Sequence, residues 1–321
     1  MVELDVRKLR VLRELDERGT VGAVAEALHL TPSAVSQQLA ALSREVGVPL
    51  LEPAGRRVRL TGAARVLLGH AHEIFARMEY LRADLAAYSA GETGQVRVAG
   101  FSTALTGLVL PAFARLRGDR PGLAPRLREA DPPHSFALLT RGDADLVIGL
   151  EAPRAPASSD RRFHRVPLLT DLLDVALPAS HPLASAPSVR LAQLAAEPWI
   201  FGSAGACRDI TVAACAAAGF TPEPAHAVFD WDAVLAMVQA GLGVAMVPRL
   251  AGARAHDGVV VRALAADRPA RHVFAVVREG SQTAPQLAAV LDALRAVAGD
   301  RSVSLNGTNG NRSMDLNGGP G

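Results

Sequence analysis

The chain lacks the features that mark several large classes of protein. Only two cysteines occur in its 321 residues, which suits a reducing compartment and leaves neither a disulfide framework nor enough thiols for a zinc site. No stretch approaches the roughly 20 consecutive apolar residues of a membrane span. The first 15 residues mix charged with apolar residues and so do not form the apolar core of a signal peptide. We therefore expect a cytoplasmic protein with no membrane partner.

Motifs of catalysis are missing as well. The sequence has no GxSxG motif, no phosphate-loop motif and no metal-ligand cluster, and its carboxylates show no spacing that picks out an acid/base pair. We expect neither enzyme activity nor a cofactor or metal. The alternative is an enzyme or solute-binding protein with an incidental helical N-terminus, but extracellular solute capture would need an export signal.

Charge of one sign is scarce, because 34 basic residues nearly balance 32 acidic ones and leave a net charge of +2. Any basic footprint for nucleic acid must therefore be local. Lys8 is the only lysine, a bias to which we attach no function. The length favours two or three domains, and 49% hydrophobic residues allow a sizeable core.

Helical periodicity predicts three short helices near the N-terminus. The first helix ends near Gly19, and Thr20 can cap a second helix over residues 21–28. Thr31 followed by Pro32 predicts the start of a third. Short helices joined by a tight turn form the helix-turn-helix pattern, and the following GVPLLEPAGRRVRLT predicts a small hairpin, or wing. The apolar positions of the first helix are Val6, Leu9, Leu12 and Leu15.

The third helix has one apolar stripe and one face of short polar side chains. The stripe consists of Val35, Leu39, Leu42 and Val46, and the opposite face of Ser33, Ser36, Gln37, Ala40 and Arg44. Short side chains let a helix approach the floor of the major groove, where serine bonds to several bases and glutamine pairs with adenine. Taken alone, this polar face is equally consistent with the solvent-exposed side of a helix that has no contact with DNA.

The wing favours the DNA-reading interpretation. Arg56, Arg57 and Arg59 follow the third helix directly, where they can neutralise phosphates or enter the minor groove. Residues 1–60 hold nine basic and eight acidic side chains, so the location of these arginines matters more than their number.

Residues 62–89 carry a heptad repeat, which predicts a rod of roughly 40 Å and a helical dimer seam. Packing of this helix on its own domain is the alternative. The two seam positions consist of Ala64, Ala71, Met78 and Leu85, and of Leu67, Ile74, Leu81 and Tyr88.

Beyond the linker at residues 91–94, buried strands alternate with helices and predict an α/β region. The expected strands are QVRVAGF, DLVIGL, LDVALP, EPWIFG and GVAMVP, and the helices are LTGLVLPAFARLRG, TVAACAAAG and AVLAMVQAG. Residues 301–321 are rich in asparagine, glycine and serine, and we expect a disordered tail.

Six segments within residues 4–297 follow a pattern shared with a known family: LRVLRELDERGTVGAVAEALHLTPSAVSQQLAALSREVGVPLL, RRVRLTGAA, LVLPAFARLRGDRPGLAPRLRE, GDADLVIG, LLDVALPASHPLA and VLAMVQAGLGVAMVP. Through these segments the chain resembles the LysR-type transcriptional regulators. The resemblance implies a winged helix-turn-helix (residues 1–61), a linker and dimerisation helix (62–90), and an effector-binding domain (95–300) similar to periplasmic binding proteins. Its first lobe spans residues 95–165 and 270–297, and its second spans 166–269.

The implied function is sequence-specific DNA binding controlled by a small effector held between the lobes, in a homodimer or homotetramer. The expected contacts with double-stranded DNA are Thr31, Ser33, Ser36, Gln37, Arg56, Arg57 and Arg59. The chain departs from the family pattern at Gln37 and Pro53, where basic residues are usual, and at Ser43 and Leu51. The phosphate contacts that basic residues make in the family are therefore not expected from Gln37 and Pro53.

Strand-to-helix junctions point to the effector site. Ligands of open α/β sheets tend to lie outside the carboxyl ends of strands, where helix N-termini favour anions. A small carboxylate or phosphate is therefore the hypothesis for the effector, although Asp230 would disfavour an anion, and simple helix capping is the alternative role for these side chains. The expected effector-binding residues are Ser102, Thr103, Gly149, Ser203, Phe229 and Asp230.

The two cysteines suggest comparison with the peroxide-sensing branch of the same family. Cys207 and Cys215 are eight residues apart, so on one regular helix their Cα atoms would lie about 12 Å from each other, beyond disulfide reach. We expect small buried residues at both positions and leave a redox role open.

Overall fold

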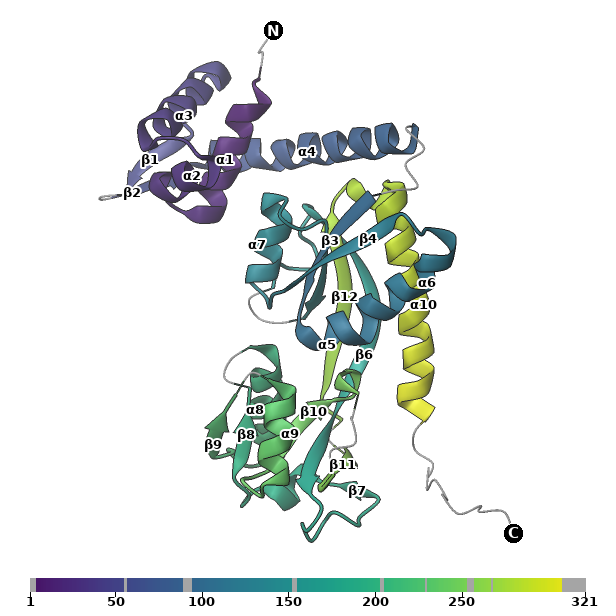
Figure 1. Ribbon diagram of the computed structural model, residues 1–321. Helices are drawn as coiled ribbons and strands as arrows, with labels where there is room; N and C mark the ends of the chain where they lie inside the picture. Colours follow the sequence, from purple (N-terminus) through teal and green to yellow (C-terminus); the bar gives the residue numbers. More distant parts are fainter. Residues whose placement is uncertain are drawn as a thin grey trace. The chain divides into compact units, whose positions relative to one another are not determined.

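The structure is a computed structural model that describes residues 4–54, 57–88, 94–151, 155–202, 205–228, 230–252, 257–266 and 268–307. The chain divides into two compact units, Met1–Leu81 and Arg82–Gly321. Figure 1 shows the elements of each unit, which we describe separately. Within the described residues no helix is both long enough and apolar enough to span a membrane.

The first unit combines short helices, a hairpin and a long helix. Its elements are α1 (Val6–Arg18), α2 (Val21–Leu28), α3 (Pro32–Val46), β1 (Leu51–Ala54), β2 (Arg57–Leu60) and α4 (Gly62–Tyr88). Side chains of α1, α2, α3 and the start of α4 share one apolar core. This arrangement confirms the predicted helix-turn-helix and wing.

The predicted caps are those that the structure uses. Gly19 ends α1 in the left-handed conformation with φ of 72°, which glycine adopts without steric cost. The Thr20 hydroxyl accepts a hydrogen bond from the Ala23 amide at 3.3 Å, and the Thr31 hydroxyl accepts one from the Ala34 amide at 3.1 Å. Each threonine thereby satisfies an amide that the first turn of its helix leaves without a partner.

The long helix α4 is confirmed, but its first half does not follow the predicted seam. Ala64 and Ala71 are fully buried in the core of their own unit, and Leu67 packs against that core. Packing within the domain, the alternative to a dimer seam, therefore holds for this half. Farther along, Ile74 and Met78 are exposed by 36% and 38%, and Leu81 and Leu85 by 58% and 57%, so the described seam positions are uncovered from the middle of α4 onward.

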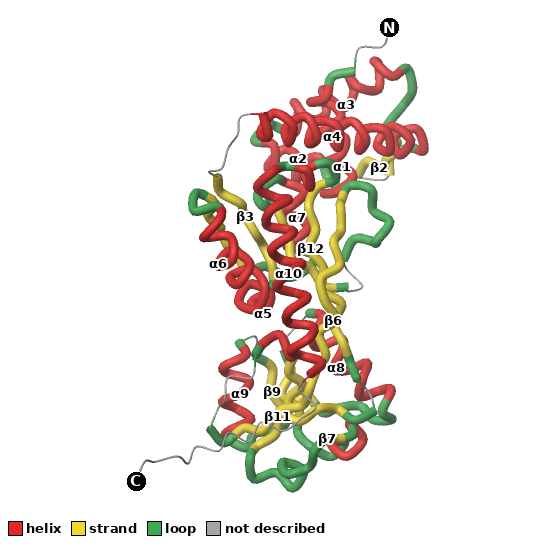
Figure 2. The backbone as a smooth tube through the Cα atoms, turned by 90° about the vertical axis from the view of Figure 1, so that its right-hand side faces the viewer, coloured by secondary structure: helices red, strands yellow, loops and turns green. Residues whose placement is uncertain are grey.

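The second unit has two lobes joined by shared strands. Its main sheet has the order β4-β3-β5-β12-β6-β11-β7, with β10 also paired to β6. The strand β6 (Phe163–Pro178) pairs with β12 (Ala270–Arg278) over its first part and with β10 (Ala245–Pro248) and β11 (Val259–Leu264) over its last residues. Figure 2 shows β6 and β12 passing from one lobe to the other.

In the first lobe, β3 lies between β4 and β5 in a parallel arrangement. Helices α6 and α10 pack together, and a π-helical turn, η1, links α5 to α6. The bounds are β3 (Gly94–Gly100), α5 (Ser102–Ala104), η1 (Leu105–Val109), α6 (Leu110–Asp119), β4 (Leu123–Glu129), α7 (His134–Arg141), β5 (Leu146–Leu150) and α10 (Pro285–Gly307).

The second lobe builds on the far half of β6. Its further elements are β7 (Ser188–Val189), β8 (Trp199–Phe201), α8 (Ala206–Ala217), β9 (Pro224–Ala227) and α9 (Trp231–Gln239), with the 3-10 turns η2 (Leu191–Leu194), η3 (Arg249–Ala251) and, back in the first lobe, η4 (Ser281–Thr283). The parallel pair β8 and β9 forms a separate two-stranded sheet. The core of the second lobe includes Trp199, Phe201 and the buried thiol of Cys215.

The predicted tail needs a correction. Helix α10 continues to Gly307, so residues 301–307 are helical rather than disordered. The Ser302 hydroxyl donates to the Ala298 carbonyl at 2.8 Å, one turn earlier, and no proline or glycine interrupts the chain between residues 300 and 306. The rest of the predicted tail, residues 308–321, lies outside the described residues.

Candidate DNA-reading face and effector site

The outer face of α3 is as predicted from its helical wheel. Val35, Leu39 and Leu42 are buried at 1% exposure or less, whereas the polar positions opposite them are open to solvent. Those exposed positions are Ser33, Ser36, Gln37, Ala40 and Arg44. Short polar side chains on a rigid, well-buried helix can approach base edges closely.

Three hydroxyls in and beside the helix-turn-helix have structural roles. Thr31 caps α3, as described above, and stays exposed. The Ser43 hydroxyl accepts a hydrogen bond from the Leu50 amide at 3.3 Å and so holds the turn that leads into the hairpin. The Thr61 hydroxyl donates to the Pro49 carbonyl at 2.8 Å and accepts from the Ala64 amide at 3.2 Å. These bonds fix the hairpin against α3 and α4.

The hairpin carries the predicted basic residues, and one of them is engaged. Arg59 and Glu52 face each other across the two strands, with the Arg59 Nη2 atom 2.7 Å from Glu52 Oε1. Arg57 begins β2, and only its backbone is described, while Arg56 lies outside the described residues. The carboxylate of Glu52 therefore offsets part of the basic charge of the wing.

The candidate effector site lies at the carboxyl ends of the parallel strands in the first lobe. Ser102 and Thr103 follow β3, and Asp131 follows β4. The Ala130 amide donates to the Gly100 carbonyl at 3.0 Å, so the two strand ends lie side by side. A sheet edge of this kind is where open α/β sheets bind ligands.

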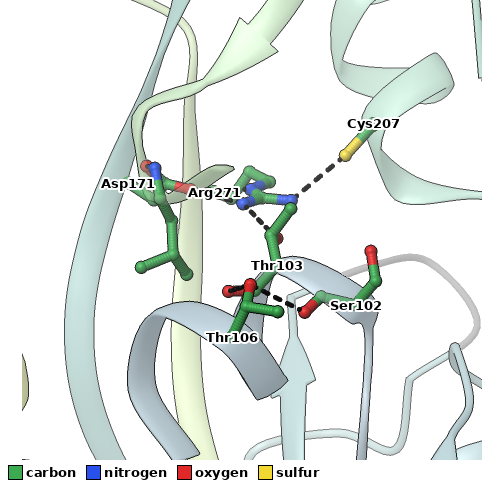
Figure 3. Close-up of polar contacts among 7 residues, drawn as sticks. Ser102, Thr103, Thr106, Asp171, Cys207 and Arg271 are labelled. Atoms are coloured by element: carbon green, nitrogen blue, oxygen red, sulfur yellow. Dashed lines mark hydrogen bonds and ion pairs between the residues drawn. The ribbon is translucent and has the colours of Figure 1, made fainter. Parts of the chain in front are cut away.

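Arg271 joins both lobes at this edge (Figure 3). From β12 its Nη2 atom donates to the Thr103 hydroxyl of the first lobe at 3.1 Å, and its Nη1 atom lies 3.3 Å from Cys207 Sγ of the second lobe. Its guanidinium also stacks over the Phe101 ring, 5.0 Å from the ring centre. Arg271, which lies on one of the two strands that join the lobes, therefore contacts elements of both lobes.

Asp171 neutralises that arginine. Arg271 Nε donates to Asp171 Oδ2 at 3.0 Å, and Nη2 makes a second contact with the same oxygen. The other carboxylate oxygen accepts from the Leu250 amide at 2.9 Å. Burial raises the pKa of the Asp171 carboxyl above its usual 3.8, and the charge of Arg271 offsets only part of that rise.

The predicted effector residues meet different environments. Thr103 is 4% exposed and bonded to Arg271, whereas Ser102 is half-buried at the start of α5. Gly149 is a correction, because it is buried in β5 with Phe274 so close that an added Cβ would lie 2.9 Å from its ring. Packing explains that glycine, and we remove it from the effector set.

At the second lobe, Asp230 caps α9, and its carboxylate accepts from the Ala233 amide at 2.8 Å. The capping alternative therefore holds for Asp230. Ser203 and Phe229 lie outside the described residues.

Both cysteines lie on α8, which begins at Ala206, five residues before the expected helical segment that starts at Thr211. Cys215 is fully buried in the apolar core of the second lobe, and Cys207 is half-buried at the start of the helix. Both are free thiols, and one regular helix keeps them about 12 Å apart. The contact of Cys207 with Arg271 distinguishes it from a purely structural thiol.

Sequence reasoning missed Arg271, Asp171 and Asp131. A charge inside an apolar strand was the available signal, as in LLTDLLDVALP and ARHVFAVVR, because a buried charge needs a partner. Sequence alone did not show that these two strands run side by side. Within the described ranges, no three histidine, cysteine or acidic residues are grouped to hold a metal ion.

Comparisons with known proteins agree with this architecture. Residues 6–65 match the family described as bacterial regulatory helix-turn-helix protein, lysR family, and residues 89–299 match the LysR substrate binding domain. A probable hydrogen peroxide-inducible genes activator of Mycobacterium avium is 32% identical over 285 residues, which cover 85% of this chain and 88% of that protein.

Solved structures show the same fold. A hydrogen-peroxide-bound cysteine variant of OxyR from Corynebacterium glutamicum has a TM-score of 0.60 at 21% identity, covering 98% of this chain and 99% of that one. Full-length CbnR in complex with its target DNA has a TM-score of 0.55 at 23% identity, covering 92% of this chain and all of that one.

Proposed function

The chain belongs to the LysR family of bacterial transcriptional regulators, and from that premise we propose the residues with which it binds DNA and its effector. Ser33, Ser36 and Gln37 read base edges in the major groove. The wing arginines Arg56, Arg57 and Arg59 neutralise phosphates beside it. Thr31 caps the recognition helix and contacts the DNA at the start of that helix.

The observation that carries this proposal is the exposed face of α3, whose side chains are short, polar and uncharged up to Arg44. Glutamine and serine can each form hydrogen bonds with base edges. Neither carries a positive charge, which would attract the phosphates of any DNA sequence equally. The effect of Gln37 should therefore depend on sequence, whereas the effect of Arg57 should not.

The test is a panel of single-base variants of a genomic site found by footprinting, measured by fluorescence anisotropy at several salt concentrations. Gln37→Ala should change the ranking of the variants. Arg57→Ala should weaken all of them by similar factors and reduce the salt slope by about 1. An equal loss on every variant for Gln37→Ala would remove this residue from the specificity set.

Two-fold symmetry sets the form of the operator. We propose that the exposed second half of α4 forms a helical seam in a homodimer, or in a homotetramer built from dimers. Two recognition helices then read half-sites about one helical turn apart, or a multiple of it.

We propose that the effector binds between the lobes at the edge formed by Ser102, Thr103 and Asp131, near Cys207, which Arg271 links to Thr103. Binding there can regulate DNA contacts only if the effector has different affinities for two arrangements of the protein. Arg271 supports this site, because it contacts both lobes at once. The protein acts by binding rather than by catalysis, in the cytoplasm.

Oxidation of Cys207 is a second candidate signal. The observation that favours it is the contact between Cys207 and the hinge: the Nη1 atom of Arg271 lies 3.3 Å from Cys207 Sγ, so a change at this sulfur would reach a side chain that contacts both lobes. A relative from Mycobacterium avium is also named a probable activator of hydrogen peroxide-inducible genes. The sulfur of Cys207, as the thiolate, would attack one oxygen of hydrogen peroxide, break the O–O bond and release hydroxide, which leaves a sulfenic acid.

Peroxide treatment followed by mass spectrometry of trapped sulfenic acid tests this second candidate, with DNA affinity measured on the same sample. Oxidation at Cys207 that alters DNA affinity supports it, and Cys207→Ser should abolish the change. A regulator that keeps the same DNA affinity after Cys207 is oxidised rules it out.

A further inference from the structure

Arg13 of α1 contacts α4 near the point where that helix leaves the core of its unit. The core takes in Leu68 and Ala71 of α4, and Phe75, one turn beyond Ala71, packs half-buried against it. The guanidinium carbon of Arg13 lies 4.4 Å from the centre of the Phe75 ring. A cation over an aromatic face is attracted by the ring, so this contact ties the helix-turn-helix to the middle of α4.

A buried carboxylate restrains Arg13 in this position. Glu14 is 2% exposed, and its Oε2 atom accepts a hydrogen bond from Arg18 Nε at 2.7 Å. Its Oε1 atom lies 3.7 Å from Arg13 Nη2. Because a buried charge is costly unless it is paired, rotation of Arg13 away from Phe75 would leave more of the Glu14 charge uncompensated.

A small tilt of α4 at Phe75 becomes a large displacement farther along the helix. Leu85, an exposed seam position, lies ten residues beyond Phe75, or about 15 Å at 1.5 Å per residue. A tilt of about 10° would therefore move Leu85 by roughly 3 Å, close to the rise of about 3.4 Å per base pair of DNA. In a dimer joined along this half of α4, such a tilt changes the separation of the two recognition helices by about the length of one base-pair step.

We infer that Arg13 is a positioning residue that sets the half-site spacing accepted by this regulator, through its contact with Phe75. This inference rests on the reading face and the α4 seam proposed above. Loss of the contact should leave each recognition helix able to read its own half-site. It should also let the two DNA-binding units take several separations, so that operators of different spacing are distinguished less well.

The test is fluorescence anisotropy of the full-length protein with the footprinted operator, with versions that have one base pair inserted or deleted between the half-sites, and with a single half-site. The spacing preference is the ratio of the dissociation constants for altered and native spacing. Arg13→Met and Phe75→Leu remove the cation and the ring but keep apolar bulk, and we expect each to reduce this preference by roughly two- to tenfold. Their affinity for the single half-site should stay close to that of wild type. The double variant should lose no more than either single variant, because all three lack the same contact.

Arg77→Met is the matched control. Arg77 lies over the Tyr80 ring at 5.9 Å, but both residues belong to α4, so loss of this contact should leave the spacing preference unchanged. Arg13→Lys and Phe75→Tyr keep a cation and a ring, and each should retain most of the preference. Because the Arg13 side chain is partly exposed, Arg13→Met tests the inference even if Phe75→Leu fails to fold.

A spacing preference that Arg13→Met leaves unchanged overturns the inference. A loss by the same factor on native, altered and single half-site DNA also overturns it, since that result shows only weaker DNA binding. Additive losses in the double variant, or a wild-type protein that binds every spacing equally, overturn it as well. Failure of the proposed reading face has a different signature, because wild type would then bind the single half-site no more tightly than unrelated DNA.

Discussion

Arg271 and Asp171 are register partners on the two strands that join the lobes, and they form a buried ion pair. Arg271 is 2% exposed and Asp171 is fully buried. Around this pair, Thr103 and Cys207 reach the same guanidinium from opposite lobes. A change in the angle between the lobes must therefore rearrange contacts of a single side chain, which is a simple way to couple effector binding to domain closure.

Breaking this pair should strongly destabilise the effector domain. Asp171→Asn leaves a buried guanidinium without a counter-charge, and we expect a loss of about 3–5 kcal/mol in the free energy of unfolding, measured with urea. Replacing both partners, as in Asp171→Leu with Arg271→Met, should recover much of that loss. Asp300→Asn removes an exposed partner of Arg115 and should have no measurable effect. Equal effects of Asp171→Asn and Asp300→Asn would contradict this account.

A different aspartate should control acid stability. Burial acts to raise the pKa of Asp145, but hydrogen bonds from the Arg97 side chain and backbone outweigh it and hold the pKa below 3.8. A carboxyl with a lowered pKa contributes stability above its unfolded pKa, and that contribution is lost as the pH falls through the folded value. The stability difference between wild type and Asp145→Asn should therefore be largest near neutral pH and shrink below pH 3.8. A difference that stays constant with pH would show that Asp145 acts through packing alone.

Gly107 should tolerate no side chain while Leu250 is present. A Cβ at this position of the π-helical turn would lie 2.6 Å from Leu250 Cδ1 and 3.0 Å from the Leu250 carbonyl oxygen. We expect Gly107→Ala to cost about 1–3 kcal/mol in thermal or urea unfolding. In a Leu250→Ala background the same change should cost less, because the nearer of the two atoms is gone. Additive costs in the double variant would refute a direct contact.

Glu52 should weaken DNA binding by competing for Arg59. Glu52→Gln removes the carboxylate that lies 2.7 Å from the guanidinium, so Arg59 becomes available for phosphate. We expect tighter binding to operator and unrelated DNA alike, with a salt slope steeper by about 1. Glu73→Gln, on the exposed surface of α4, is the control. If Glu52→Gln left the salt slope unchanged, Arg59 would have no role at phosphate.

The uncovered half of α4 should determine the oligomeric state. Leu81→Asp places a charge at a seam position that is 58% exposed, and sedimentation should show a shift toward monomer that depends on concentration. Val66→Asp is a suitable control, since Val66 is 65% exposed but lies outside the two seam positions. An unchanged oligomer with Leu81→Asp would place the seam elsewhere.

Local patterns of residues are enough to predict the elements of the DNA-binding unit. Its caps at Thr20 and Thr31 and its glycine stop at Gly19 are decided within one helical turn, so residue type is enough to predict them. The same holds for the faces of α3, because a period of 3.6 residues fixes which side chains point together. The resemblance to a known family supplied the lobes and the order of the domains.

Which surfaces are covered, and which residues distant in the chain are in contact, depends on tertiary packing. Ala64 and Leu81 occupy seam positions of one heptad pattern, yet the first is buried in its own unit and the second is exposed. Arg271 and Asp171 are 100 residues apart in the chain and meet because β6 and β12 pair in one register. Periodicity reports the apolar face of a helix but not its partner, and strand pairing depends on long-range contacts that no local pattern encodes.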